Sequence, residues 1–517
     1  MPDFIGDVGL LVFLPSLGAI LLLLIPRENG AAIFNTALFF TFLTFLWSLK
    51  IFAAFDPAQA GLQFVERIPW IPAYGVEFFV GIDGINLFLV LLTTLLSPIV
   101  VLASLRVSQR IKEYFFFMLL LETGMIGTLV AFDLFLFYVF WEIMLVPMYF
   151  IIGVWGGSRR IYAAVKFVIY TMSGSLLMLV AIIYLAVRHA EINNVLTFDL
   201  FRLYGLNLPF SEQAWLFAAF ALSFAIKVPL FPLHTWLPDA HVEAPTAGSV
   251  ILAGVLLKMG TYGLLRFSIP LFPEVTLSAV PLFLTLAVIG IIYGALVAMI
   301  QPDLKKLVAY SSVSHLGFVV LGLFALNLNG LQGALYQMLN HGLSTGALFL
   351  MVGMIYDRYH TRMIADFGGL WQRLPVFSVF FLIVTLSSIA LPGLNGFIGE
   401  FLILLGAFHA DPLATAFAAT GVILAPIYML WMFRRVVFGP VKVLGEGNVR
   451  DLDLREKLVL SPLLALIIFM GIYPEPFLTR MKPSLEQVLK RVEIHKAAVM
   501  SQEKVTGRAD RQKPHGN

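Results

Sequence analysis

Long uninterrupted runs of apolar residues are the feature that most constrains this chain. An apolar run of about 18 residues or more is a candidate membrane-spanning helix, because that length crosses the hydrocarbon core of a bilayer. Such runs fill most of the 517 residues. Charged residues make up 13% of the sequence, about half the fraction typical of soluble domains. The sequence therefore predicts an all-α polytopic membrane protein.

The predicted topology comes from the number of apolar runs and from the basic residues between them. We expect about 14 membrane-spanning helices. Lys and Arg in short loops are enriched on the cytoplasmic side of a membrane. By this rule the loops with Arg106, Lys305 and Arg358 face the cytoplasm, whereas Arg67 and Arg266 lie on the opposite side. An even number of spans then places both termini outside the cytoplasm.

Two predicted spans are interrupted, at Lys227-Val228-Pro229 and at Leu391-Pro392-Gly393. Proline removes a backbone donor and clashes with the preceding turn. Paired broken helices are typical of transporters built from inverted repeats, although ordinary proline kinks are the simpler alternative. The predicted organisation is three N-terminal helices in 1–112, two inverted five-helix repeats in 113–267 and 276–438, a last span in 457–475 and a basic amphipathic tail in 476–517.

Ionisable side chains occur inside the predicted spans, where a charge costs about 2.5–3.5 kcal/mol on insertion scales. Such residues face the interior of a bundle and mark transport pathways. An isolated carboxyl at that depth would be protonated, so Glu142 indicates a cationic partner or proton exchange. The predicted proton-carrying residues are Glu142, Lys227, Lys258, His315, His341 and Glu400.

Three further residues are accessory candidates. Glu122 is a carboxyl within a predicted span, and His234 and His241 flank the loop after the first break, where they could form a proton entrance from the cytoplasm. Structural explanations stay open. A buried Glu or His can be satisfied by a neighbouring helix, and Lys166, near its helix start, can extend to the interface.

Five stretches of the sequence carry a family resemblance. They are Gly81 to Asn86, Asp133 to Glu142, Lys227 to Pro245, Ala309 to His315 and Asn395 to Phe401. In these stretches, which are spread over nearly the whole sequence, the chain resembles the antiporter-like subunits of respiratory complex I, the NADH–quinone oxidoreductase. The resemblance is greatest to the M-type subunits, homologues of mitochondrial subunit 4. Glu rather than Lys at position 400 is the M-type choice.

The resemblance implies a role for each candidate. Glu142 and Lys227 would form a coupled pair, Lys258 the central relay, and Glu400 the terminal proton site. His315 and His341 would extend the polar axis between them. Glu122 also resembles a carboxylate of this family.

The resemblance also implies a proton-translocating subunit of the bacterial inner membrane, with both termini periplasmic. Electrons would pass from NADH to quinone elsewhere in the complex. NAD, FMN, iron–sulfur clusters and quinone would belong to partner subunits, and we expect no cofactor and no metal in this chain. The antiporter-like subunits L and N would lie on either side. Absence of cysteine excludes thiolate-ligated clusters here.

Other functions remain open on the sequence alone. A subunit of a multisubunit cation/proton antiporter, or of a membrane-bound hydrogenase, would share this fold. A haem protein with His315 and His341 as axial ligands is a different class, which an absorption spectrum distinguishes. A purely structural spacer is a third possibility, which variants of Glu142 and Lys227 would test.

Overall fold

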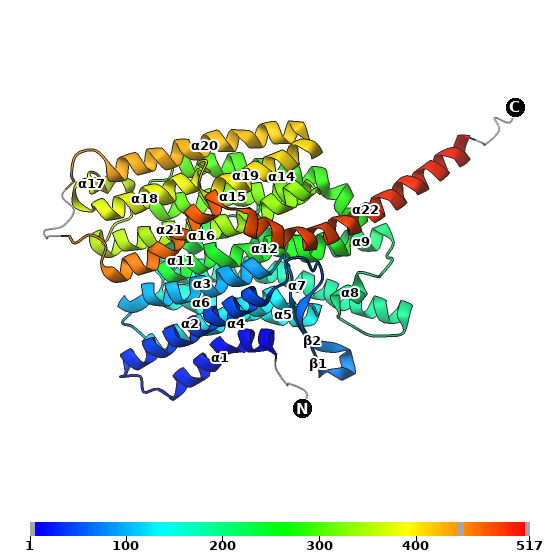
Figure 1. Ribbon diagram of the computed structural model, residues 1–517, viewed down its shortest axis with the longest axis horizontal. Coiled ribbons are helices and arrows are strands. Elements are labelled where there is room, and N and C mark those ends of the chain that lie inside the picture. Colours follow the sequence, from blue (N-terminus) through cyan, green and yellow to red (C-terminus); the bar gives the residue numbers. More distant parts are fainter. Residues whose placement is uncertain (1–5, 443–448, 512–517) are drawn as a thin grey trace.

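The long helices of this computed structural model lie side by side in one bundle (Figure 1). The structure describes residues 6–442 and 449–511, and only the backbone for residues 495–511. Within the described part, 11 helices are long and apolar enough to cross a membrane, or up to 12 if a bent pair counts as one span. The multi-pass helical architecture is thereby confirmed.

The N-terminal helices lie on one flank of the bundle and helices from the C-terminal half lie on the other (Figure 1). The first half contains α1 (Asp7–Leu24), α2 (Gly30–Ala54), α3 (Leu87–Ala103), α4 (Ile111–Val130), α5 (Leu134–Ile143), α6 (Leu145–Trp155), α7 (Arg160–Asn193), α8 (Leu200–Leu203), α9 (Phe210–Lys227), α10 (Trp236–Glu243), α11 (Thr246–Ile251), α12 (Leu257–Gly263) and α13 (Ile269–Leu271). The second half contains α14 (Pro273–Met299), α15 (Leu304–Phe324), α16 (Leu328–Tyr359), α17 (Leu370–Arg373), α18 (Pro375–Ser388), α19 (Asn395–Ala410), α20 (Pro412–Val437), α21 (Leu454–Ile472) and α22 (Glu475–Arg511).

The structure is not entirely helical. Strands β1 (Gln63–Ile71) and β2 (Val76–Ile82) form an antiparallel hairpin in a segment that the sequence predicts as a loop. Its turn contains Pro72 and Gly75, and Gly75 has a left-handed φ of 65° that favours glycine. The side chain of Arg67 pairs with Asp199, which fixes the hairpin to the segment before α8. The all-α prediction is corrected to a mostly helical fold with one small sheet.

Two spans form the centre of the bundle. Residues 246–271 pass through α11, α12, α13 and two π-helical stretches, and α16 lies against them. Both spans are buried along their most apolar windows, whereas only 33% of the corresponding window of α20 is buried. Polar side chains on these two spans therefore face protein rather than lipid.

Both predicted interruptions occur in the structure. Helix α9 ends at Lys227 and α10 begins nine residues later, at Trp236. Helix α18 ends before the Pro-Gly motif, and α19 begins at Asn395. Side chains satisfy the freed carbonyls: Trp236 Nε1 donates to Ile226 O at 2.9 Å, and Asn340 Nδ2 donates to Asn395 O at 2.8 Å. Irregular backbone is tolerated at membrane depth where protein surrounds it in this way.

Helix α22 lies across other helices of the bundle, and the last part of α22 projects beyond them (Figure 1). It follows α21 after a bend of 73°. The sequence predicts an amphipathic helix near 481–497 that lies on a membrane surface or a partner. In the described part, its apolar face packs instead on α13, α14 and α16 of the same chain. The buried side chains of that face are Met481, Leu485, Val488, Leu489 and Val492.

Candidate functional site

Lys258 lies on α12, between the π-helical stretches Leu252–Leu256 and Leu264–Ser268. Lys258 is buried, with 1% of its surface exposed. The amine Nζ lies 2.6 Å from Nδ1 of His341 on α16, and it also donates to the carbonyl oxygen of Ala253. Since π-helical turns are frequent at functional sites, this local geometry fits the predicted role of Lys258 as a relay.

A second contact joins His315 on α15 to Glu400 on α19. Nδ1 of His315 lies 3.1 Å from Oε1 of Glu400. Gln337 of α16 donates from Nε2 to the same carboxyl oxygen at 3.2 Å. Glu400 is 4% exposed and follows the second break by about one turn of α19. The break thus delivers a carboxyl to the protein interior rather than to lipid.

The two histidines connect these contacts. The ring centroids of His315 and His341 are 5.9 Å apart. A cavity of about 10 Å³ lies between them, lined also by Ser344 and Ser388, and this volume suffices for about one water molecule. In the described part of the chain, Nε2 of His341 has no hydrogen-bond partner. Four predicted residues, Lys258, His341, His315 and Glu400, therefore form one row across the centre of the bundle.

Among the described residues, no hydrogen bond or ion pair joins Glu142 or Lys227 to this row. Lys227 is 2% exposed, and its Nζ lies 5.3 Å from the ring centroid of Trp141 and 5.4 Å from that of Phe167. Within the described residues Glu142 and Lys227 form no direct ion pair and interact only at longer range. Glu142 is half-buried rather than buried, because α5 ends at the next residue and a junction with α6 follows. The structure therefore shows Glu142 less buried than Lys227, and its pairing with Lys227 stays a prediction.

The accessory candidates occupy three separate places. Glu122 is fully buried on α4, near Ser97. His234 lies in the first break against Tyr293, with 5.0 Å between ring centroids. His241 is fully buried, stacks on Phe349 at 4.5 Å and lies within electrostatic range of Lys258 and Lys305. Of these three described residues, His241 is the one that interacts electrostatically with members of the row, Lys258 and His341.

A larger cavity of about 540 Å³ opens at the end of the bundle predicted to be cytoplasmic. Both signs of charge line it, including Arg106, Glu243, Lys305, Asp357 and Arg362. The sequence places Lys305 in a loop, but its side chain is buried and donates from Nζ to Ala244 O at 2.7 Å. Through Lys305, the cavity wall therefore lies within electrostatic range of His241.

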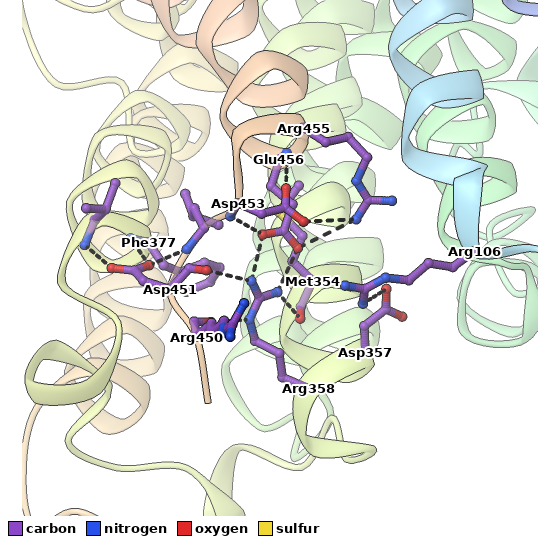
Figure 2. A network of polar contacts seen from close by, with 12 residues as sticks. Arg106, Met354, Asp357, Arg358, Phe377, Arg450, Asp451, Asp453, Arg455 and Glu456 are labelled. Carbon is purple, nitrogen blue, oxygen red and sulfur yellow. Dashed lines mark hydrogen bonds and ion pairs between the residues drawn. The ribbon is translucent and has the colours of Figure 1, made fainter. Parts of the chain in front are cut away.

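Figure 2 shows a network of polar contacts that includes residues of this cavity wall. Arg358, near the end of α16, makes two parallel hydrogen bonds to Glu456 at the start of α21, at 2.8 and 2.6 Å. Asp453 and Glu456 form a capping box for α21. Asp451 accepts the N–H of Phe377 in the first turn of α18 at 3.1 Å. The network therefore fixes the ends of three helices relative to one another.

Sequence reasoning missed one buried ion pair. Asp83 Oδ1 and Arg266 Nη2 are 2.6 Å apart, and each side chain is 6% exposed. Arg266 was expected in a loop outside the membrane. The signal that could have found it is its spacing, because Lys258, Tyr262 and Arg266 recur every four residues on one helix face. Lys166 likewise pairs with Asp239 at 2.7 Å rather than extending alone to the interface.

A multi-pass bundle with titratable side chains in contact across its centre defines the class of ion-translocating membrane proteins. Residues 131–425 match the family described as NADH:quinone oxidoreductase/Mrp antiporter, transmembrane. The chain is 46% identical over 497 residues to NADH-quinone oxidoreductase subunit M of Rhodobacter capsulatus, covering 93% of this chain and 96% of the relative. It is 47% identical over 494 residues to NADH-ubiquinone oxidoreductase chain 4 of Marchantia polymorpha, covering 95% and 98%.

Solved structures agree with the sequence relatives. A chain of respiratory complex I from Thermus thermophilus with bound NADH matches with a TM-score of 0.85 and 36% identity, over 94% of this chain and 99% of that chain. The protein therefore belongs to the subunit M/chain 4 family of NADH–quinone oxidoreductase.

Proposed function

We propose that this chain is a proton-translocating subunit of NADH–quinone oxidoreductase. The observation that carries the proposal is the row Lys258, His341, His315 and Glu400, in which direct contacts or a water-sized cavity join neighbouring groups. Electron transfer from NADH to quinone takes place in partner subunits, which hold NAD, FMN, the iron–sulfur clusters and quinone. This chain contributes the proton path and holds no cofactor or metal.

The row supports stepwise transfer because each member has a protonated and an unprotonated form. The Lys258 amine gives its proton to Nδ1 of His341, and His341 releases the proton on Nε2. One water in the cavity passes a proton to His315, whose Nδ1 donates to Oε1 of Glu400. Histidine suits the middle positions since its ordinary pKa of about 6.5 allows both forms near neutral pH.

Proton uptake starts from the large cavity at the cytoplasmic end. Lys305 lines the cavity, and His241 lies in electrostatic range of both Lys305 and Lys258. His241 is therefore the group that we assign to proton transfer from this cavity toward Lys258. His234 and Glu122 serve this uptake as accessory groups.

Coupling to electron transfer acts through Glu142 and Lys227. Moving one charge against about 150 mV costs roughly 3.5 kcal/mol, equal to a pKa change of about 2.5 units. A charge arriving beside a buried group, or leaving it, shifts its pKa by about 1–3 units. Opening and closing the Glu142–Lys227 interaction is thus of the required size.

The finer architecture follows the family. We place inverted repeats at residues 113–267 and 276–438. We also count three further spans beside the 11 long helices, namely α9, the broken pair of α18 and α19, and α21, so that the total is about 14 membrane spans. Helices α18 and α19 are 14 and 16 residues long, so each alone is shorter than the roughly 18 residues that cross a membrane. The subunit lies in the bacterial inner membrane with both termini periplasmic and subunits L and N on either side.

The test replaces Lys258 by Met in the assembled complex. Met keeps most of the side-chain volume but carries no proton, so NADH-driven proton pumping in membrane vesicles should fall by about tenfold or more, as expected for loss of an acid–base group. Lys442→Met, at an exposed position, is the matched control. Glu142→Gln and Lys227→Ala should also reduce pumping sharply.

Normal pumping by the assembled Lys258→Met complex would refute the proposal, and a purely structural role of this chain as a spacer would then be the better explanation. Copurification with small antiporter subunits, in place of subunits that contain flavin and iron–sulfur clusters, would support the cation/proton antiporter instead.

A further inference from the structure

We infer that the Asp83–Arg266 ion pair insulates Lys258 from the non-cytoplasmic surface, so that a proton on Lys258 leaves only through His341. This inference rests on the proposed function, because it concerns the route that a translocated proton takes. It assigns a positioning role to two residues outside the predicted row.

The pair is fully engaged with protein groups. Oδ1 of Asp83 accepts the Arg266 guanidinium at 2.6 Å and the N–H of Ile85 at 2.9 Å. Nε of Arg266 donates to the hydroxyl of Tyr262 at 3.3 Å, and the guanidinium carbon lies 4.9 Å from the ring centroid of Phe132. Three separate segments of the chain therefore hold the guanidinium and its partner in one place.

Arg266 also lies on the same helix face as Lys258. Lys258, Tyr262 and Arg266 are four residues apart and share a helix face. At about 1.5 Å per residue, Arg266 is roughly 12 Å from Lys258 along the helix axis. The hydroxyl of Tyr262 between them donates to Leu129 O at 2.8 Å. Tyr262 and Arg266 thus form a column of polar groups between the level of Lys258 and the non-cytoplasmic end.

Arginine stops a relay at this point. A group passes a proton on only if it can lose its own, and a guanidinium with a pKa above about 12 does not do so in proteins. Paired with Asp83, Arg266 also leaves the carboxylate occupied and unable to accept a proton readily. The column therefore contains polar groups yet carries no protons past Arg266.

Two other segments close the pair from outside. The N–H of Gly84 donates to Ser484 Oγ of α22 at 3.0 Å, and a Cβ on Gly84 would collide with the carbonyl oxygen of Arg480. The hydroxyl of Tyr204 donates to the backbone carbonyl of Arg266 at 2.7 Å. The Arg491 side chain of α22 binds the carbonyl oxygen of Tyr204 as well. The docked part of α22 thus keeps water away from the pair.

A purely structural ion pair is the competing explanation, and proton leak distinguishes the two. Arg266→His retains a partner for Asp83 but introduces a group with an ordinary pKa near 6.5. In proteoliposomes containing the whole complex, passive proton leak should rise by about tenfold or more, because the unprotonated fraction of this group at pH 7 rises by several orders of magnitude. Net pumping should fall while NADH oxidation continues. Arg188→His, at a more exposed ion pair, is the matched control.

A second pair of variants covers a failure of Arg266→His to assemble. Arg266→Gln leaves Asp83 as a titratable carboxyl at the end of the column and should leak. The double variant Asp83→Asn/Arg266→Gln has no titratable group there and should be as tight as the wild type. Assembled Arg266→His or Arg266→Gln complexes without leak would overturn the insulation while wild-type pumping still stands. Loss of the proposed function itself would appear instead as normal pumping by Lys258→Met.

Discussion

Replacing Glu400 by Gln is the sharpest test of the terminal proton site. Gln has nearly the same shape and still accepts the hydrogen bond from Gln337, now 3.2 Å from the carboxyl oxygen. It cannot, however, take up a proton. The change therefore separates the chemistry of the carboxyl from its packing.

The magnitude follows from the two contacts of Oε1. The contact with His315 at 3.1 Å is a charge-assisted hydrogen bond when the carboxyl is ionised, worth about 1.5–3 kcal/mol against about 1 kcal/mol for a neutral bond. Losing the difference costs about 1 kcal/mol of stability, which the assembled complex tolerates. A proton on His315 loses its acceptor, so a barrier increase of about 1.5–3 kcal/mol slows pumping by roughly 10-fold to 150-fold.

The assay compares two rates in membrane vesicles. Proton pumping is followed by quenching of a pH-sensitive dye, and NADH oxidation by an artificial acceptor reports the assembled electron-transfer subunits. We expect the first rate to collapse and the second to stay unchanged. Glu113→Gln, at a half-exposed surface pair with Arg27, should change neither. Normal pumping by Glu400→Gln would show that the terminal site lies elsewhere.

Two further predictions concern the groups around this site. Gln337→Leu removes the second hydrogen-bond donor to Glu400, and a hydrogen bond to a charged group is worth about 1.5–3 kcal/mol. We therefore expect Gln337→Leu to lower the pumping rate about tenfold, whereas Gln337→Asn should retain part of that rate. Equal rates in both variants would contradict the role of the amide. Glu456→Ala removes the carboxylate partner of Arg358, whose guanidinium keeps three backbone carbonyl acceptors. Losing a hydrogen bond to a charged group should make unfolding easier by about 1.5–3 kcal/mol. Thermal unfolding of the purified complex measures this, and an unchanged melting temperature would show that the ion pair is dispensable.

The sequence predicted the helical spans well because they depend on local properties. Apolar runs of sufficient length and Pro-containing breaks are visible in a single stretch of chain, and Lys227 and Asn395 lie at the expected interruptions. The spacing of Gln337 and His341 also places both on one face of α16. These are short-range patterns that need no knowledge of helix packing.

The contacts of the site could not be read in the same way. Lys258 and His341 are 83 residues apart, and His315 and Glu400 are 85 apart, so their meeting depends on how four helices pack. Arg266 was assigned to a loop because basic residues near a span end usually are. Its partner Asp83 lies 183 residues away, and neither residue alone reveals the pair. The half-burial of Glu142 likewise depends on where α5 ends.

Helix α16 contributes contacts to both ends of the row. His341 contacts Lys258, and Gln337 donates a hydrogen bond to Glu400. Arg358, near the C-terminal end of the same helix, binds Glu456. Because Gln337 and His341 lie on one face of the same helix, a rotation or shift of α16 moves both contacts together. The packing of this single helix therefore sets the geometry at both ends of the row, and a displacement at one contact is transmitted to the other.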